Sequence, residues 1–441
     1  QSRILVGAMR VGIVIVRVDI VAFILGAVAA VVAPLGLVEQ GADATDLQEA
    51  FEVLPGSSKT GGPLPRAWLG GDSDVSVVIR GGASGRRVLW VFADTLVGRY
   101  SAAAKARLGA GLEMPCSSVA LVDCGKDSCV GRPRFFWQRS AEGTTLPFFD
   151  MPAARRARGE ILWPVAGIAS RDGDSVLLLA QRLLRPMTVL GTTAIVIRGV
   201  GAEEDPRDWA YTTFDLGDGE MTWFSGITYA ADDGDGVYLF GHERSSARGG
   251  RHRHRTLRER WSRTLLARAS LTRLLAHDWT GAQYWVEPGT WASPRAPHAL
   301  GAAKRLVVPT WESTCTWSHE LQLWYVFNVE GGGVALWTAS HVAGLWSRAG
   351  EVYGLPKPFA GNSSWLCYAA KAHPELRSNA AARPLDTVEL VFSWICNSWG
   401  DEGTWNAELF QPGGMDLSVR GYWPRFVRVL VRRTPIEIRT A

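Results

Sequence analysis

Short apolar runs of about five to seven residues recur along this chain between turns that contain Gly or Asp. Runs of this length with such boundaries are typical of β-strands. Pairs of these runs recur near residues 90, 178, 238, 324 and 392. The average spacing of about 75 residues leaves room for about four strands per unit. The pattern predicts an all-β fold, a five-bladed β-propeller, with a pair of β-sandwiches as the alternative.

The composition agrees with this fold class and excludes others. Hydrophobic residues make up 47% of the 441 residues and charged residues 20%, which excludes a mainly disordered chain. The 48 glycines favour tight turns over long helices, and the 20 tryptophans fit a β-protein with aromatic platforms or a large core. A formal net charge of +4 is too small to indicate a nucleic-acid partner.

The N-terminal region contains one long apolar segment. Residues 20–38 are uncharged and mostly apolar, and Arg3, Arg10 and Arg17 precede them. Such a segment can cross a bilayer as a helix with its N-terminal side in the cytoplasm. A cleaved signal peptide and a buried apolar segment are the alternatives. Either form of export would place the rest of the chain outside the cell or in the secretory-pathway lumen, as a type II membrane protein where the helix is retained.

These features give the expected domain organisation. Residues 1–40 are a signal anchor or transmembrane helix, an N-terminal hydrophobic helix whose membrane tether lies within 11–38. Residues 41–65 are a linker rich in Gly, Pro and Ser. Residues 66–432 form the propeller, and 433–441 are a C-terminal tail.

Six cysteines in an exported chain permit three disulfides. Cys124 and Cys129 are close enough to close one loop, and Cys367 and Cys396 flank a predicted hairpin. Asn362 begins a glycosylation sequon, which carries a glycan only if the chain is exported. No motif for a metal or cofactor is present, so none is expected; a structural Ca²⁺ in the channel has no motif behind it.

Acidic residues stand at the starts of several predicted inner strands. In a propeller these strand ends converge on one mouth of the central channel, although they are far apart in sequence. Two facing carboxyl groups are what glycoside hydrolysis requires, one to protonate the leaving oxygen and one to attack or to activate water. The candidates for such chemistry are Asp72, Asp94 and Glu312, with His373 and Glu375 as substrate-binding residues.

Each candidate also has a structural interpretation. Asp72 lies in a Gly-Asp-Ser-Asp sequence that suits a turn, and Asp94 is placed to bond neighbouring backbone amides. His373 precedes a proline and fits a structural turn. Trp163 and Trp223 head predicted inner strands, where they can stack on a sugar ring or fill the core.

Several of these segments together resemble a known family, the proteins with domain of unknown function 4185. The segments are GGDSDVSVVI, GRRVLWVFADTLVG, MPCSSVALV, WPVAGIASRDGDSVLLLAQRL, TWFSGITYAADDGDGVYLFGHE, YAAKAHPELR and GYWPRFVRVLV. That family belongs to the five-bladed propeller group of arabinanases, levansucrases and invertases. The resemblance covers roughly residues 66 to 432.

The resemblance implies a secreted or membrane-tethered glycoside hydrolase that acts on a polysaccharide, with furanosyl polymers among the candidate substrates. By this likeness Asp72 is the nucleophile or base, Glu312 the general acid and Asp94 a positioning residue. Ala93 departs from the family, in which Gly is usual before this aspartate. The alternative function is a non-catalytic propeller that binds glycans or serves in a surface or extracellular assembly.

One further segment is strongly basic. Residues 242–263 are rich in Arg and His, a composition that suits a polyanion partner or a solvated insertion within the third unit. The solvated insertion is the favoured interpretation.

Overall fold

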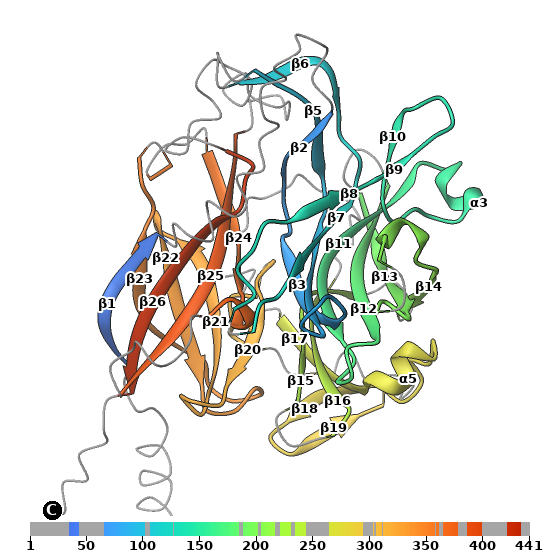
Figure 1. Cartoon of the computed structure of the whole chain (residues 1–441). Helices are drawn as coiled ribbons and strands as arrows, with labels where there is room; N and C mark the ends of the chain where they lie inside the picture. The colour runs from blue at the N-terminus through green and yellow to red at the C-terminus, as the bar shows by residue number, and fades with distance from the viewer. Residues whose placement is uncertain are drawn as a thin grey trace, which may run out of the picture.

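In the computed structural model of the chain, most strands form five antiparallel sheets of four or five strands each (Figure 1). The structure describes residues 35–43 and 66–433 apart from several internal segments, of which 244–263 and 399–420 are the longest. The sheets are blades arranged around a central channel, and each blade begins with its innermost strand. The predicted five-bladed β-propeller is therefore confirmed, and the pair of sandwiches is excluded.

The blades follow one another along the chain. Blade one contains β3 (Val75–Arg80), β4 (Arg86–Phe92), β7 (Ser118–Asp123) and β8 (Arg134–Phe136). Blade two contains β11 (Glu160–Ala169), β12 (Ser175–Leu184), β13 (Thr188–Arg198) and β14 (Tyr211–Leu216). Blade three contains β15 (Met221–Tyr229), β16 (Gly236–Glu243), β17 (Thr264–Ser270), β18 (Gln283–Glu287) and β19 (Thr290–Ala292). Blade four contains β20 (Cys315–Ser318), β21 (Leu323–Glu330), β22 (Gly333–Ala339) and β23 (Ser347–Gly354). Blade five contains β24 (Trp365–Ala372), β25 (Thr387–Ser398), β26 (Arg425–Arg433) and β1 (Leu35–Asp43).

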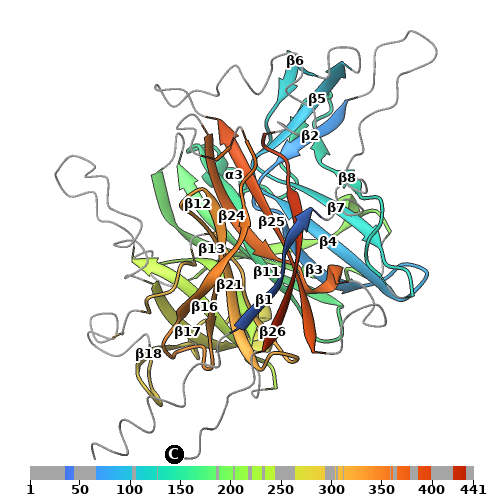
Figure 2. The same cartoon turned by 90° about the vertical axis from the view of Figure 1, so that its left-hand side faces the viewer.

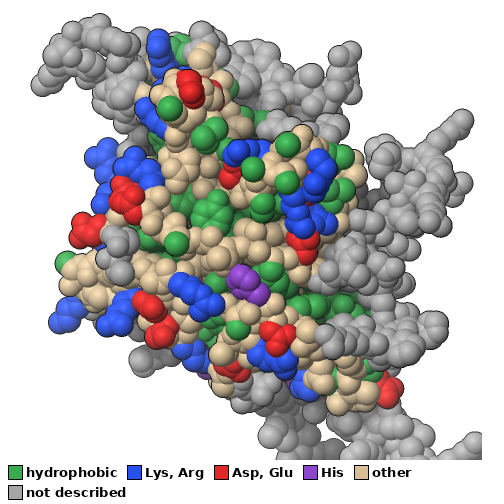
Figure 3. Space-filling view, turned by 90° about the vertical axis from the view of Figure 1, so that its right-hand side faces the viewer, with side chains coloured by type: hydrophobic (Ala, Val, Ile, Leu, Met, Phe, Trp, Pro, Cys, Tyr) green, Lys and Arg blue, Asp and Glu red, His purple; other side chains and the backbone are tan. Residues whose placement is uncertain are grey.

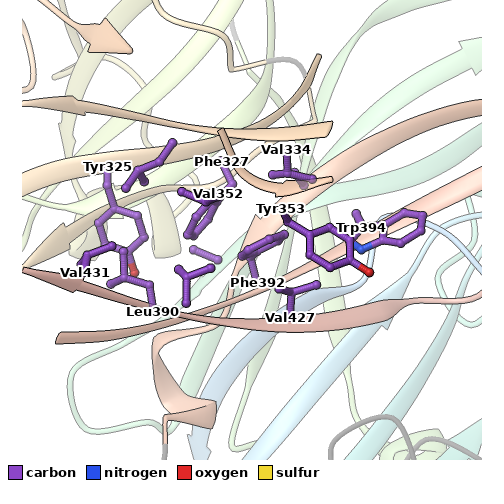
Figure 4. Packing of buried hydrophobic residues seen from close by; sticks show 14 of the residues in the cluster. Tyr325, Phe327, Val334, Val352, Tyr353, Leu390, Phe392, Trp394, Val427 and Val431 are labelled. Atoms are coloured by element: carbon purple, nitrogen blue, oxygen red, sulfur yellow. The ribbon is translucent and has the colours of Figure 1, made fainter. Parts of the chain in front are cut away.

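Five clusters of buried hydrophobic residues hold the blades together, one at each blade-to-blade contact. They join blades one and two, two and three, three and four, four and five, and five and one. Figure 4 shows the cluster between blades four and five, where Phe327 lies against Phe392 with ring centroids 4.3 Å apart. Because the fifth cluster returns to the first blade, the sheets close into a ring.

Strand β12 shows why the apolar runs are nearly continuous. Leu177 and Leu179 belong to the cluster shared with blade three, while Val176 and Leu178 belong to the cluster shared with blade one. Successive residues of a strand point to opposite faces of the sheet. Both faces of a blade are covered by its neighbours, so almost every position in its inner strands is apolar.

A second, smaller sheet projects from one end of the ring. It contains β2 (Ala67–Gly71), β5 (Thr95–Ser101) and β6 (Ala106–Glu113), and it lies above blade one in Figures 1 and 2. The buried Arg107 of β6 donates hydrogen bonds to the carbonyl oxygens of Leu69 and Gly421, which ties this sheet to the segment before β26. The other short elements are β9 (Gln138–Arg139), β10 (Thr145–Leu146), the helices α3 (Ala153–Arg156) and α5 (Leu271–Leu275), and two 3₁₀ turns at Pro206–Asp208 and Pro374–Leu376.

The N-terminal boundary differs from the one expected. Leu35–Asp43 forms strand β1, which pairs antiparallel with β26 as the outermost strand of blade five. The expected apolar helix therefore cannot extend to residue 38, nor does a linker begin at residue 41, because backbone pairing completes the last blade there. The rest of the proposed anchor, the remainder of the linker and most of the C-terminal tail lie outside the described residues. Among the residues that are described, no helix has the length and apolar character to span a bilayer.

Two disulfides are present, and they join the two pairs of cysteines that lie close together or flank the predicted hairpin. Cys124 bonds Cys129, and Cys367 bonds Cys396 across the β24–β25 pair. The remaining cysteines, Cys116 and Cys315, are buried and form no third disulfide. The sequon at Asn362 and most of the basic segment 242–263 lie outside the described residues.

Candidate functional site at one end of the channel

The innermost strands β3, β11, β15, β20 and β24 begin at the same end of the channel. The residues just before β3 and β20 are Asp72 and Glu312, and Asp72 contacts residues in the first halves of β11 and β24. We call this the carboxylate end. The second halves of the same strands surround a cavity at the opposite end, which we call the cavity end. The small sheet β2–β5–β6 stands on the carboxylate side, because β2 leads directly into the start of β3 (Figure 1).

Asp72 is held by donors from two different blades. The Trp163 indole N–H of blade two donates to its Oδ1 at 3.3 Å, and the Tyr368 hydroxyl of blade five donates to its Oδ2 at 2.8 Å. The residue is only 3% exposed. Its position is therefore fixed by the ring closure itself, since the three residues come from separate blades.

Asp94 lies beside Asp72 through a reciprocal backbone contact. The Asp72 N–H donates to the Asp94 carbonyl at 3.2 Å, and the Ala93 N–H donates to the Asp72 carbonyl at 2.9 Å. The Tyr422 hydroxyl also donates to the Asp94 carbonyl, at 2.9 Å. Ala93 does not have a positive φ, so alanine is compatible with the backbone at this point.

Glu312 approaches the same end from blade four, which is not a neighbour of blade one in the ring. It is half-buried, and its charge acts on Asp72 across the channel. The ammonium group of Lys371 lies within range of Glu312, Asp72 and Asp74, and its Nζ donates to the Val165 carbonyl at 2.9 Å. The three predicted catalytic residues thus meet at one end of the channel, with a buried lysine beside them.

The electrostatics of this cluster favour retention of protons. Burial, followed by the charges of Asp94 and Glu312, raises the pKa of Asp72 well above its ordinary value. Burial also raises the pKa of Glu312, against the opposing charge of Lys371. Burial lowers the pKa of Lys371, although the surrounding carboxylates oppose this shift. Like charges this close cannot all ionise together, so the cluster holds a proton at a higher pH than an isolated carboxyl group would.

Backbone strain is concentrated at the carboxylate end. Among the described residues, seven other than glycine have a positive φ, and five of them lie in or beside this cluster. These are Ser73 (70°), Asp74 (24°), Glu312 (51°), Ala369 (53°) and Tyr422 (55°). Each such residue costs about 1–3 kcal/mol, and strained residues of this kind collect at functional sites.

Gly70 shows how tightly the Asp72 loop is packed. Its φ is +137°, and a Cβ at this position would lie 2.1 Å from the Tyr422 carbonyl oxygen. The next residue, Gly71, donates its N–H to the same oxygen at 3.1 Å. The Gly-Gly pair before Asp72 therefore allows a close backbone approach that any side chain at residue 70 would prevent.

Of the two tryptophans predicted to bind substrate, only Trp163 lies at the site. Trp163 is half-buried and bonded to Asp72. Trp223 is completely buried in the cluster between blades two and three, where it packs against Trp279 and Tyr284 at 5.7 and 5.5 Å. The prediction that Trp223 stacks on substrate is therefore wrong, because both faces of its strand are covered by neighbouring blades.

His373 and Glu375 also lie elsewhere than expected. His373 is fully buried between the two ends of the channel, and Glu375 lines the cavity at the far end. On one side of the ring, the His373 Nε2 is 2.7 Å from the Ser393 Oγ, and Ser393 donates to Asp74. On the other side, the Nδ1 is 2.6 Å from the Ser76 Oγ, and Ser76 donates to Glu375. This chain crosses the contact between blades one and five, so neither residue can bind substrate beside Asp72.

The direction of these hydrogen bonds determines the protonation state of the His373 imidazole. Both serine hydroxyls donate to carboxylates, so both ring nitrogens must donate to the hydroxyls, which requires an imidazolium. Burial opposes the charge, but the hydrogen bonds with Asp74 and Glu375 outweigh it and raise the pKa of His373. The five groups form a continuous charged link through the middle of the channel.

Sequence reasoning missed three residues of the site: Tyr368, Lys371 and Tyr422. Two of them lie in the segment YAAKAHPEL, whose His and Glu were selected instead. An alternating pattern was available, because Tyr368 and Lys371 lie on the inner strand β24, which ends at Ala372 just before His373. A bulge between Tyr368 and Lys371 shifts that alternation, which explains why simple periodicity does not identify the residues that face the channel.

Among the described residues, no group of three or more His, Cys, Asp or Glu side chains is arranged to hold a metal ion. The carboxylates at the carboxylate end are instead neighbours of Lys371 and of the tyrosine hydroxyls.

Comparisons with solved structures show only distant likenesses. The chain is 10% identical to a variant of the exo-beta-1,3-galactanase from Phanerochaete chrysosporium with beta-1,3-galactotriose, covering 90% of this chain and 64% of that one, with a TM-score of 0.38. It is 12% identical to the GH43_1 enzyme from Xanthomonas citri complexed with xylose, covering 86% and 98%, with a TM-score of 0.33. It is 9% identical to the phage phi92 endosialidase, covering 84% and 68%, with a TM-score of 0.31. The chain thus spans less than two thirds of the galactanase structure.

No curated protein sequence matches the chain. One family model does, described as Domain of unknown function (DUF5005), and it covers residues 65–431. These bounds agree closely with the predicted propeller, although the family is not the 4185 family that the motifs resemble. Since the match covers most of the sequence, the chain belongs to the DUF5005 family.

Proposed function

We propose that the carboxylate end of the channel hydrolyses a glycosidic bond in a polysaccharide. The observation that carries this proposal is the convergence of Asp72 and Glu312 from non-adjacent blades, at the place where backbone strain is concentrated. A pair of carboxyl groups on either side of the scissile bond is the minimum apparatus of most glycoside hydrolases.

The surroundings of the two groups suggest how they divide the reaction. Glu312 is half-buried and burial raises its pKa, which suits the group that delivers a proton to the leaving oxygen. Burial and neighbouring charges raise the pKa of Asp72, but the hydrogen bonds that it accepts from Tyr368 and Trp163 oppose this shift. These donors stabilise the ionised form, which is the form that attacks or activates water. Asp94 adds negative charge beside Asp72, which suits a developing positive charge on the sugar.

The compartment and the substrate follow from the same proposal. Two disulfides fit an oxidising environment, so we place the enzyme outside the cell or in the secretory lumen. The substrate is a polysaccharide, with furanosyl polymers among the candidates. Retention of a membrane anchor within residues 11–34 is part of the proposal.

The test is hydrolysis by the purified chain on a panel of furanosyl and pyranosyl polysaccharides, followed through the release of reducing ends. Asp72→Asn and Glu312→Gln should each lower the rate on the active substrate by at least about 100-fold. Asp278→Asn, at an exposed turn after α5, should leave the rate unchanged. Full hydrolysis by Asp72→Asn would contradict the proposal.

A non-catalytic function is the second candidate, and one observation favours it. Asp72 is nearly inaccessible, and both its carboxylate oxygens are already bonded to protein donors. A propeller with this arrangement could bind a glycan at the carboxylate end without cleaving it. Binding of a polysaccharide by the wild-type chain without release of reducing ends would select this function.

A further inference from the structure

The cavity end of the channel holds a second candidate site. A cavity of about 810 Å³ opens there, a volume typical of small-molecule and oligosaccharide sites. All five blades line it, through the final residues of their inner strands and the turns that follow. Its lining includes Ser76, Arg80, Arg171, Tyr229, Trp317 and Glu375.

Side chains in the middle of the channel separate this cavity from the carboxylate end. Asp74, Lys371 and His373 are each 0% exposed. They are fixed by hydrogen bonds to Ser393 and to the backbone of blade two. A ligand in the cavity would therefore occupy a site distinct from that of Asp72 and Glu312.

The charges around the cavity favour an anion. Arg80, Arg86 and Arg171 line it, against the acidic Asp172 and Glu375. Glu375 is already matched by the imidazolium of His373, whose Nδ1 lies 3.6 Å from its Oε1. Apart from this pair, the cavity lining contains three guanidinium groups and one carboxylate, that of Asp172.

These arginines differ from those on the outer face of the ring. Around β14 and α3, basic and acidic side chains lie next to one another (Figure 3), and Arg155 and Arg156 pair with Asp215 and Asp150. Among the residues that the structure describes, the Arg80 guanidinium makes no hydrogen bond or ion pair of this kind. Its charge acts on the nearby Asp172, but its N–H donors are available to a ligand.

Arg171 is held in position but keeps donors available. Its guanidinium lies over the Tyr229 ring at 4.3 Å, and its Nε donates to the Gly234 carbonyl at 2.7 Å. The terminal nitrogens of the group are not used by these contacts. A guanidinium fixed in this way is suited to a bidentate contact with a carboxylate.

An aromatic side chain lies on another part of the wall. Trp317 of blade four lines the cavity and is half-buried, with its Nε1 3.3 Å from the His319 Nδ1. Arg80 and Arg171 come from blades one and two. The cavity thus offers guanidinium groups on one side and an indole on another, with the Ser76 hydroxyl in its lining.

We propose that the cavity end binds an acidic sugar unit of a glycan, with its carboxylate on Arg80 and Arg171 and its ring against Trp317. A uronic acid has the required carboxylate, an apolar ring face for the indole and hydroxyls for the polar wall. This site does not depend on the hydrolysis proposed for the carboxylate end.

Calorimetric titration of the purified chain with a hexamer of galacturonic acid tests the proposal. The hexamer should bind with a micromolar to millimolar Kd, while neutral maltohexaose should not bind. Arg171→Gln and Arg80→Gln should each weaken binding at least about tenfold, and Trp317→Ala should weaken it comparably. Near-ultraviolet circular dichroism confirms that each variant is folded.

Two controls make the result specific. Arg207→Gln, which removes an exposed arginine paired with Asp205 on blade two, should leave the affinity unchanged. Asp72→Asn should also bind the hexamer normally, so that failure of the hydrolase proposal would not affect this one. The proposal is overturned by absence of binding, by equal binding of maltohexaose, by equal binding of a (dT)6 oligonucleotide, or by unaltered affinity in the arginine variants.

Discussion

The two ends of the channel are built from the same five strands but differ in almost every physical property. The carboxylate end has buried acidic groups, positive φ angles at five residues and backbone contacts too close for a Cβ. The cavity end has turns that carry exposed arginines and an open volume of about 810 Å³. Strain and most of the buried acidic groups are thus concentrated at one mouth of the propeller, while the other mouth holds the open cavity.

The comparison predicts the largest loss of stability at Lys371, the buried cation of the carboxylate end. Lys371→Met removes the positive charge near Asp72, Asp74 and Glu312 and should lower the free energy of unfolding by about 3–5 kcal/mol. Urea denaturation measures the change, with the exposed Lys357→Met as the matched control. A loss below about 1 kcal/mol would mean that the lysine does not compensate the carboxylates.

A smaller loss is expected at Gly70, where the backbone approach is closest. Gly70→Ala should cost about 2–3 kcal/mol because its Cβ would collide with the Tyr422 carbonyl and strain the Asp72 loop. Gly143→Ala is the control, since its φ is also positive but no atom lies within 4 Å of the added Cβ. Thermal denaturation of both variants separates the effect of the collision from that of backbone strain, because both variants have the strain and only Gly70→Ala has the collision. Equal losses of stability in the two variants would argue against the collision.

The next prediction concerns His373, which lies between the two ends. Its pKa is raised in the folded chain, so its charged form contributes stability that is fully present below the unfolded pKa of about 6.5. This contribution should disappear as the pH rises through the folded pKa. Urea denaturation at a series of pH values measures this loss of stability. In His373→Gln, stability should fall less steeply between pH 6.5 and the folded pKa of His373, whereas in the exposed His319→Gln the fall should be unchanged. An unchanged slope in His373→Gln would show that the imidazolium is absent.

The smallest effect on stability is expected at the cavity end. Arg171→Gln removes only an exposed guanidinium from the Tyr229 ring and the Gly234 carbonyl, and should change the unfolding free energy by less than about 1 kcal/mol. The same denaturation experiment used for Lys371→Met measures it. A loss as large as that of Lys371→Met would remove the contrast between the two ends.

The fold was predictable because the strands of a propeller are local units. Each apolar run lies near its sequence neighbour in the same blade, so runs such as Val88–Phe92 and Val388–Trp394 reveal the blades without knowledge of long-range contacts. The meeting of Asp72, Asp94 and Glu312 followed from the same repeat, since Asp72 and Glu312 precede inner strands and Asp94 follows the strand paired with β3. Their catalytic roles stay predictions.

What depended on contacts between blades could not be predicted. Trp223 and Trp163 occupy similar places in sequence, but the neighbouring blades bury only the former completely. Lys371 and His373 are separated by one residue, but only the folded chain shows that Lys371 bonds to the backbone of blade two and His373 to serines of blades one and five. At the N-terminus, hydrophobicity alone did not distinguish a membrane helix from the edge strand at Leu35–Asp43.

That edge strand has a practical consequence for anyone shortening the polypeptide. The family match begins at residue 65, yet β1 covers the hydrogen-bonding edge of β26 thirty residues upstream in the sequence. A version cut at the family boundary would leave a long valine-rich strand with unsatisfied amides and carbonyls facing solvent. Such a product is expected to self-associate through that edge, so a shortened polypeptide should keep Leu35–Asp43.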